Sequence, residues 1–386
     1  MSQNKTISSL FPGATIGILG GGQLGRMISM EAKRMGFNVH IFDPTPNGPA
    51  AQVSDKETNA PFEDANALKA FMRHIDVLTF EFENIATRAL RQLNSDHMIF
   101  PNLNALEICQ NRILEKNFIS SLGIQTAPYS EIKSVEDLTA FLDNHSKAII
   151  KTATLGYDGK GQAQIDKTNF SDIWSHFNKN QPCIVEGFVA FDFEASALCA
   201  RNHSGEFRMF PIAHNIHKDH ILDITMVPAH IDDNIIKNIK TLSKAITSGL
   251  DYVGVLCIEL FIKGNEVFVN ELAPRPHNSG HYSLDFAYTS QFEQHVRAIC
   301  NLPLGNPNLI PGAAAMANLL GDLWHQHSLG CPNWKEALKV NDSKLHLYGK
   351  KEPKLKRKMG HISASASSTI QARKIVEEAR DNLLKS

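Results

Sequence analysis

The chain has 386 residues, of which 42% are hydrophobic and 20% charged, and these proportions are typical of a globular protein with two or three domains. Its formal net charge of -1 argues against a nucleic-acid binder that works by bulk positive charge, and no run of about 18 apolar residues is present that could span a membrane. The six cysteines are scattered without a C-x-x-C pair, and residues 1–10 lack a secretory apolar core, so we expect a cytoplasmic protein with reduced thiols.

Residues 14–43 have the pattern of a strand, a helix and a second strand. Gly20, Gly22 and Gly25 fit the G-x-G-x-x-G pattern between the first strand and the helix. The second strand ends at Asp43, close to the acidic position that binds the ribose of a nicotinamide cofactor. The pattern leaves two interpretations open. Either the glycines bind a nicotinamide cofactor, or they only let the helix pack closely on the strand.

An N-terminal Rossmann-like α/β domain is expected to cover residues 1–102. Within it, 77–80 is a predicted buried strand that ends just before Glu81. Because the carboxyl ends of strands in doubly wound sheets face the ligand crevice, Glu81 and Gln23 are candidate substrate contacts. The alternative is that Glu81 only caps the helix that follows it.

A glycine-rich run follows the apolar strand predicted at 148–150. This strand leads into Lys151, so we expect the Lys151 ammonium group to lie close to the run. The run consists of Gly156, Tyr157, Asp158, Gly159, Lys160, Gly161 and Gln162. A backbone this rich in glycine can fold over phosphate groups and donate its N–H groups to them. No GxxxxGK[ST] occurs, so a Walker P-loop is excluded, and the alternative is a glycine-rich hairpin with solvated charges.

The middle of the chain, residues 103–300, is predicted as an α+β domain with a smaller lobe at 103–185 and a larger lobe at 186–300. The patterns predict helices at 111–122 and 136–142, and strands at 183–189, 191–199, 207–212, 253–262 and 266–272. Residues 301–386 are predicted as a small β-rich C-terminal domain that ends in a helix at about 369–384.

Two carboxylates interrupt apolar strands of the larger lobe. Glu259 and Glu271 each have apolar residues on both sides, and a predicted hairpin at 264–265 sets their strands side by side. Buried carboxylates are costly unless they are paired or bind a metal. Together with the Asn270 amide they would form an oxygen site suited to Mg²⁺ that carries phosphates. The alternative is that both carboxylates point to solvent.

The segment 274–281 follows the second carboxylate directly. Arg275 offers a fork of donors, and Asn278 and Ser279 add neutral donors in a loop stiffened by proline. This combination recognises a small planar oxyanion such as a carboxylate, bicarbonate or an acyl phosphate.

The motifs together resemble a known family. The residues that resemble the ATP-grasp enzymes are Lys151, the GYDGKGQ run, Glu186 in its E-G-F-V turn, Glu259 and Asn270-Glu271. GILGGGQLGRM at 17–27, EFEN at 81–84, RPHNSGH at 275–281 and YGKKEPKLKRKMGHI at 348–362 narrow the resemblance to the 5-(carboxyamino)imidazole ribonucleotide synthetases. The resemblance extends from about residue 14 to 362.

The resemblance implies an ATP-grasp fold with an N-terminal Rossmann-like, biotin-carboxylase-like domain and a small C-terminal β-rich domain. It implies the N-carboxylation of 5-aminoimidazole ribonucleotide, driven by ATP and bicarbonate with Mg²⁺, through carboxyphosphate. This is a step of de novo purine (IMP) biosynthesis. The family further implies a homodimer. From the composition we expect a cytoplasmic protein that binds neither nucleic acid nor membrane.

The resemblance also implies roles for individual residues. It implies ATP binding by Arg112, Lys151, Gly156, Tyr157, Asp158, Gly159, Lys160, Gly161, Gln162, Glu186, Gly187, Phe188, Val189, Glu194, His217, Asn270 and Glu271. It implies ribonucleotide binding by Gln23, Glu81, Tyr157, Asp158, Lys351, Arg357 and Lys358. The implied catalytic residues are Arg275, His277, Asn278 and Asp158, and the implied metal ligands are Glu259 and Glu271.

The chain departs from the family pattern at two positions where the family usually has glycine, Leu155 and Lys356. Neither departure removes an implied ligand. The alternatives are another ATP-grasp carboxylase or formyl-transferring ligase, an NAD-dependent oxidoreductase, or a nucleotide-binding module without activity.

Overall fold

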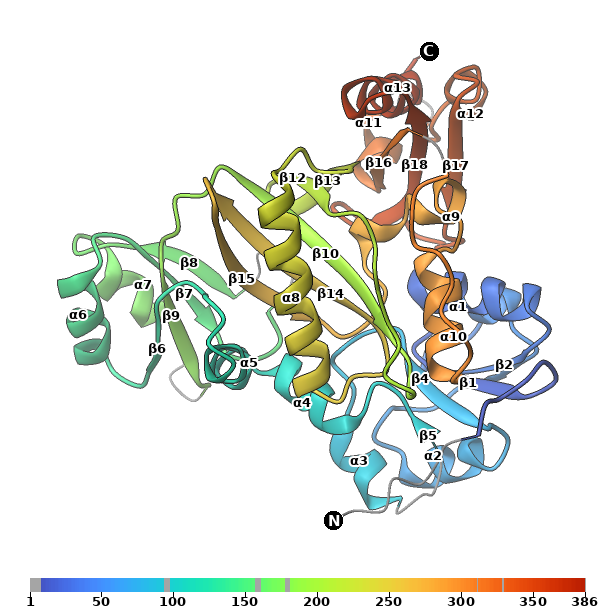
Figure 1. Cartoon of the computed structure of the whole chain (residues 1–386), viewed down its shortest axis with the longest axis horizontal. Helices are drawn as coiled ribbons and strands as arrows, with labels where there is room; N and C mark the ends of the chain where they lie inside the picture. The colour runs from blue at the N-terminus through green and yellow to red at the C-terminus, as the bar shows by residue number, and fades with distance from the viewer. Residues whose placement is uncertain are drawn as a thin grey trace.

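The computed structural model describes residues 8–93, 98–156, 161–177, 181–310, 312–327 and 330–385. These residues form three sheets, and the chain runs from an N-terminal α/β unit through a projecting lobe into one large sheet (Figure 1). No helix in these ranges is long and apolar enough to cross a bilayer. All six cysteines lie in them and none forms a disulfide.

The N-terminal unit is a parallel sheet of strand order β3-β2-β1-β4-β5. Its elements are β1 (Thr15–Leu19), α1 (Gln23–Arg34), β2 (Asn38–Phe42), η1 (Ala51–Val53), β3 (Lys56–Thr58), α2 (Ala65–Met72), β4 (Val77–Phe80), α3 (Thr87–Gln92), β5 (Met98–Ile99) and α4 (Leu103–Gln110). All four residues of β4 are buried, because helices cover both faces of a parallel sheet. The predicted strand–helix–strand unit at 14–43 is confirmed.

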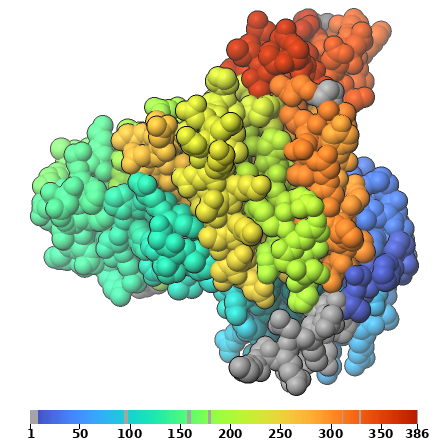
Figure 2. Space-filling model, viewed as in Figure 1, coloured from blue at the N-terminus to red at the C-terminus, as the bar shows by residue number. Residues whose placement is uncertain are grey.

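The smaller lobe is an antiparallel sheet of order β6-β9-β7-β8, and it projects from the body of the molecule (teal and green in Figure 2). Its elements are α5 (Arg112–Ser121), β6 (Tyr129–Ile132), α6 (Val135–Asn144), β7 (Ala148–Thr152), β8 (Gln162–Ile165), α7 (Phe170–His176) and β9 (Cys183–Gly187). The predicted strand at 183–189 therefore ends two residues early, since Phe188 turns out to solvent.

The larger lobe contributes most of a long sheet whose order is β15-β14-β10-β12-β13-β16-β18-β17, with β11 paired to β10. Its elements are β10 (Phe193–Arg201), β11 (Phe207–Met209), β12 (Ala213–Lys218), β13 (Ile221–Val227), α8 (Asp233–Gly249), β14 (Gly254–Lys263), β15 (Glu266–Ala273), η2 (Asn278–Gly280), α9 (Ser283–Phe286) and α10 (Gln291–Ile299). The predicted strand at 207–212 is wrong beyond Met209, where Pro211 cannot donate to a ladder.

The C-terminal segment does not form a sheet of its own. Its elements are β16 (Ala313–Leu320), α11 (Asp322–Gln326), α12 (Trp334–Ala337), β17 (Ser343–Leu347), β18 (Lys358–Ala366) and α13 (Thr369–Asn382). Strand β16 pairs with β13 of the larger lobe, so the β-rich C-terminal part extends the same sheet (Figure 1). Side chains on β16 are thereby held against the larger lobe.

Candidate active site

Two cavities meet above the large sheet. The first, about 600 Å³, lies between the smaller and larger lobes, and we call it the inter-lobe cavity. The second, about 650 Å³, lies between the N-terminal unit and the segment 350–358, and we call it the N-terminal cavity. The residues that line both are Glu259, Glu271, His277, Asn278 and Lys358. A group bound in one cavity can therefore reach a group bound in the other at this junction.

The two strand-borne carboxylates lie side by side at the junction. Glu259 and Glu271 are direct partners in the β14–β15 ladder, as the predicted hairpin requires. The ladder shifts by one residue beside them, which makes Asn270 an extra residue in a β-bulge. The buried Asn270 Oδ1 has no hydrogen-bond partner among the described residues. Two carboxylates and a spare amide oxygen fit the ligand preference of Mg²⁺.

Arg112 keeps the second carboxylate ionised. Its Nη1 lies 2.8 Å from Glu271 Oε2. Burial opposes ionisation of Glu271, but the charge and hydrogen bond of Arg112, together with the nearby charge of Lys151, outweigh burial and lower the pKa of this carboxyl to about 2. Glu271 is therefore an anion throughout the physiological pH range.

His277 has a defined tautomer. The Ser279 N–H donates to His277 Nδ1, so Nδ1 is an acceptor and Nε2 carries the proton. Nε2 lies 3.0 Å from Glu259 Oε1, which it reaches as a donor. The geometry therefore suits His277 to orient the Glu259 carboxylate.

Lys151, on the wall of the inter-lobe cavity, belongs to a buried network of charges. Lys151 Nζ donates to Glu186 Oε2 at 3.0 Å, and Lys116 Nζ lies 3.6 Å from the same oxygen. Burial opposes ionisation of Glu186, but the two lysines outweigh it and lower the pKa. The other oxygen, Oε1, is buried without a partner in the described part of the chain. It is therefore free to accept a hydrogen bond from a ligand.

Glu115 and Lys116 belong to the site, although the sequence analysis did not single them out. Both are buried, at 2% and 0% exposure. Glu115 Oε1 accepts from Leu272 N at 2.7 Å, and Lys116 Nζ donates to Asn270 O at 2.8 Å. They thus hold the outer edge of β15 on both sides of Glu271. Their place beside Arg112 in the chain is a weak sequence signal, because charged residues on a helix are usually solvated.

The N-terminal glycine loop is already filled by carboxylates of the chain. Glu81 accepts from Gly22 N at 2.6 Å and from Gly25 N at 2.9 Å. Asp43 Oδ2 accepts from Gly21 N at 2.7 Å. These N–H groups at the start of α1 are the ones that would bind a dinucleotide pyrophosphate. The alternative that Glu81 only caps the following helix is wrong, because its carboxylate accepts from N–H groups at the start of α1 instead.

The N-terminal cavity has a strongly basic wall. The cations that line it are Lys350, Lys354, Lys356, Arg357, Lys358 and Arg275. Arg275 Nε donates to Glu83 Oε2 at 2.5 Å. Glu83 is the second acidic residue of the EFEN segment, and the sequence analysis assigned no role to it. Lys351, by contrast, is exposed and lies outside the lining of both cavities.

The structure brings most of the predicted site residues to these two cavities. Those that line at least one are Gln23, Glu81, Arg112, Lys151, Gly156, Gln162, Glu194, His217, Glu259, Asn270, Glu271, Arg275, His277, Asn278, Arg357 and Lys358. Those that line neither cavity are Gly161, Glu186, Gly187, Phe188 and Val189. Tyr157, Asp158, Gly159 and Lys160 lie outside the described residues.

His217 and Glu194 form an ion pair on the wall of the inter-lobe cavity. Burial opposes protonation of His217, but the Glu194 carboxylate outweighs it and raises the pKa of the imidazole. Nearby, Phe191 and Phe261 stack with ring centroids 4.5 Å apart. The cavity thus combines an apolar wall with polar groups, as sites for aromatic ligands commonly do.

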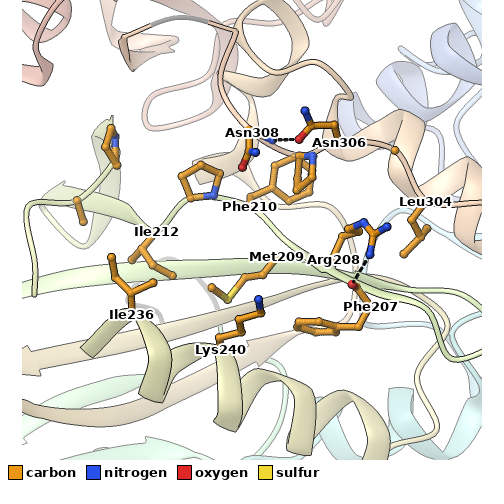
Figure 3. A pocket seen from close by; sticks show the side chains of 15 residues that line it. Phe207, Arg208, Met209, Phe210, Ile212, Ile236, Lys240, Leu304, Asn306 and Asn308 are labelled. Carbon is orange, nitrogen blue, oxygen red and sulfur yellow. Dashed lines mark hydrogen bonds between the residues drawn. The ribbon is translucent and has the colours of Figure 1, made fainter. Parts of the chain in front are cut away.

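A third cavity of about 720 Å³ lies away from this junction (Figure 3). Met209, Ile212 and Ile236 contribute apolar side chains from β11, the following segment and α8, and Asn306 and Asn308 lie across from them. Among the described residues, its lining includes none of the predicted site residues and no carboxylate, so its size alone does not make it the candidate active site.

Comparisons with known proteins agree with the motifs. Residues 13–110 match the ribonucleotide synthetase preATP-grasp domain, 117–292 the ATP-grasp domain, and 314–375 the phosphoribosylaminoimidazole carboxylase C-terminal domain. The N5-carboxyaminoimidazole ribonucleotide synthase of Brucella melitensis biotype 1 is 42% identical over 368 residues, which cover 94% of this chain and 99% of that protein. The chain belongs to the N5-carboxyaminoimidazole ribonucleotide synthase family.

Solved structures of the N5-carboxyaminoimidazole ribonucleotide synthase family have the same fold. An ADP complex of one synthetase superposes with a TM-score of 0.91 at 39% identity, and covers 98% of this chain and 100% of that one. The Aspergillus clavatus enzyme, in complex with ADP and 5-aminoimidazole ribonucleotide, gives a TM-score of 0.86 at 26% identity. That match covers 97% of this chain and 99% of the fungal one. The ATP-grasp fold expected from the sequence is confirmed.

The two departures from the pattern of the N5-carboxyaminoimidazole ribonucleotide synthase family share one backbone feature. Leu155 has φ 64° and Lys356 has φ 63°, both in the left-handed region. Glycine adopts this region without steric cost, whereas other residues do so at about 1 kcal/mol or more. The positions therefore favour glycine, and this chain tolerates strain at both edges of the site.

Proposed function

We propose that this chain uses ATP and bicarbonate to carboxylate the amino group of 5-aminoimidazole ribonucleotide, in de novo purine biosynthesis. The observation that carries the proposal is the junction of the two cavities at Glu259, Glu271, His277, Asn278 and Lys358. A triphosphate in one cavity and a ribonucleotide in the other would present the γ-phosphate and the acceptor amine to the same point.

The reaction proceeds in two steps. A bicarbonate oxygen attacks the γ-phosphorus, and ADP leaves, which forms carboxyphosphate. The substrate amine then bonds to the carboxyl carbon, directly or after release of CO₂, and the C–O bond to phosphate breaks. The amine loses one proton in this step. Phosphoryl transfer of this kind depends on positioning and on stabilisation of negative charge more than on covalent chemistry of the protein.

Arg275 and Asn278 hold the bicarbonate and the carboxyphosphate. Arg275 lines the N-terminal cavity beside Asn278. Burial lowers the pKa of Arg275, but the charge and hydrogen bond of Glu83 together outweigh burial and hold this pKa above its usual value. Glu259, Glu271 and the spare Asn270 oxygen would hold Mg²⁺, which neutralises charge on the transferring phosphate. His277 keeps Glu259 oriented for this task.

ATP occupies the inter-lobe cavity. Lys151 lines this cavity and suits the phosphates, and the glycine-rich run that follows it remains a predicted phosphate contact. The buried, unpartnered Glu186 Oε1 suits a donor such as the exocyclic amine of adenine, and Glu194 with His217 suits the ribose. Gly187, Phe188 and Val189 remain predicted contacts of ATP.

The ribonucleotide occupies the N-terminal cavity. Arg357 and Lys358 suit its 5′-phosphate, and Gln23 and Glu81 line the same cavity. Lys351, Tyr157 and Asp158 remain predicted contacts, and Asp158 remains a predicted catalytic residue.

The family resemblance also supports a cytoplasmic homodimer that binds small molecules and no nucleic acid. The free cysteines favour a reducing compartment. The net charge of -1 gives no electrostatic reason to bind nucleic acid.

Release of ADP with each substrate omitted in turn tests the proposed function. We expect rapid release only when bicarbonate, Mg²⁺ and 5-aminoimidazole ribonucleotide are all present, because carboxyphosphate is productive only beside the acceptor. Equal rates with a different amine or a formyl donor would indicate a sister ligase. ATP binding without turnover under all conditions would indicate an inactive binding module.

The filled glycine loop predicts that the chain does not bind nicotinamide cofactors. Since Glu81 and Asp43 occupy the donors at the start of α1, we expect no saturable binding of NAD⁺ or NADH at millimolar concentration. NADH fluorescence titration measures this, with ADP binding as a positive control. Tight NADH binding that competes with the ribonucleotide would contradict our assignment of this cavity.

A further inference from the structure

Asn278 is part of a buried pair of amides. Its Nδ2 donates to Asn318 Oδ1 at 3.0 Å, and Asn318 Nδ2 donates back to Asn278 Oδ1 at 2.7 Å. The two residues are 8% and 2% exposed. Asn318 lies on β16, so the C-terminal segment supplies the partner of a residue at the cavity junction.

A main-chain carbonyl fixes the orientation of this pair. Asn318 Nδ2 also donates to Leu222 O, on β13, at 2.7 Å. If the Asn318 amide were turned over, its oxygen would face the Leu222 carbonyl oxygen and the contact would be repulsive. Asn318 therefore presents an acceptor to Asn278 Nδ2 and a donor to Asn278 Oδ1. The orientation of Asn278 follows from that of Asn318.

This orientation determines what Asn278 offers to a ligand. A reciprocal amide pair uses the edge that carries the oxygen and one N–H, so the second N–H of Asn278 points away from Asn318. Asn278 makes no other side-chain hydrogen bond within the described ranges. Because its side chain lines both cavities, this N–H is a donor for an anion at the junction.

The main chain of the loop is held independently of Asn318. Gln291, on α10, accepts from His277 N at 2.8 Å and donates to His277 O at 2.7 Å. Removal of Asn318 should therefore free the Asn278 amide while the loop stays in place.

We propose that Asn318 is a positioning residue that turns the Asn278 amide so that an N–H faces bicarbonate and carboxyphosphate at the cavity junction. This inference rests on the proposed function. It gives the C-terminal strand a role in the carboxylation step that is separate from the basic segment 350–358.

A double-mutant cycle between the two residues tests the proposal. We expect Asn318→Ala to raise the KM for bicarbonate about tenfold, the lower end of the effect of one hydrogen bond to a charged group. The KM values for ATP and the ribonucleotide should change less than twofold. Asn278→Ala should raise the bicarbonate KM at least as much, and the double variant should match Asn278→Ala alone, because Asn318 acts through Asn278.

Asn382→Ala is the matched control. Asn382 is also a buried asparagine that donates to a main-chain oxygen, that of Glu336, but it lies on α13 away from both cavities. It should lower the thermal unfolding temperature without raising the bicarbonate KM. If Asn318→Ala fails to fold, Asn318→Ser, which keeps one hydroxyl donor, takes its place in the cycle.

Two results would overturn the inference while the proposed function stands. The first is a normal bicarbonate KM in a folded Asn318 variant of an active enzyme. The second is an additive effect of the two substitutions, which would indicate that Asn318 acts on stability or on another group. A wild-type protein without bicarbonate-dependent ADP release would instead refute the proposed function itself.

Discussion

Glu271→Gln should lower turnover at least about a hundredfold and leave the fold intact, because the transferring phosphate loses an anionic metal ligand. The structure adds a second reason, since Arg112 lies 2.8 Å from this carboxylate and would lose its ionic partner. Steady-state ADP release at saturating substrates measures turnover. Calorimetric ADP binding with and without Mg²⁺ tests the loss of the metal ligand, and the enhancement by Mg²⁺ should shrink in the variant.

Glu266→Gln provides a matched control for this experiment. Glu266 begins the same strand but is exposed, and it lines neither cavity. Its substitution should leave turnover and the Mg²⁺ dependence of ADP binding within about twofold of the wild type, as surface substitutions usually do. Near-normal turnover of the Glu271 variant at saturating Mg²⁺ would remove this residue from the site.

Arg357→Ala should raise the KM for the ribonucleotide about 10- to 150-fold and leave the KM for ATP little changed. A charge-assisted contact to a phosphate contributes roughly 1.5–3 kcal/mol, which corresponds to this range. Arg357 lines the N-terminal cavity and is absent from the wall of the inter-lobe cavity. Lys351→Ala should also raise the KM for the ribonucleotide if the segment 350–358 closes on this substrate.

Lys151→Ala should show the opposite selectivity. Of the two cavities, Lys151 lines only the inter-lobe cavity. Its loss should therefore weaken the binding of ATP and leave the binding of the ribonucleotide little changed. Kinetics with each substrate varied in turn separate the two cases, and Lys335→Ala, a change of an exposed lysine on α12, is the control. Loss of ATP affinity in the Arg357 variant, with ribonucleotide affinity retained, would contradict our placement of the acceptor.

The sequence predicts the carboxylate pair because its parts are close in the chain. Glu259 and Glu271 are joined by one hairpin, so alternation and turn chemistry are enough to place them side by side. The glycine loop shows the opposite case. Its donors are taken by Glu81, which is 59 and 56 residues away from Gly22 and Gly25. No local pattern encodes that contact. The sequence alone therefore could not exclude a dinucleotide-binding site at this loop.

Other parts of the site depend on packing between distant elements. Glu115 and Lys116 lie on a helix where charged residues usually face solvent, and only contact with β15 buries them. Asn318 lies in an apolar strand that the sequence assigns to a separate C-terminal domain. Its contact with Asn278 requires β16 to pair with β13, which hydrophobic pattern does not specify.

The fate of the bicarbonate oxygens tests the central claim most directly. With ¹⁸O-labelled bicarbonate, ATP, Mg²⁺ and the ribonucleotide, we predict that the inorganic phosphate released carries ¹⁸O. The label is retained because the oxygen that attacks the γ-phosphorus stays with phosphate when the C–O bond of carboxyphosphate breaks. Mass spectrometry of the phosphate measures the label. Formation of carboxylated product together with unlabelled phosphate would contradict a reaction through carboxyphosphate at this junction.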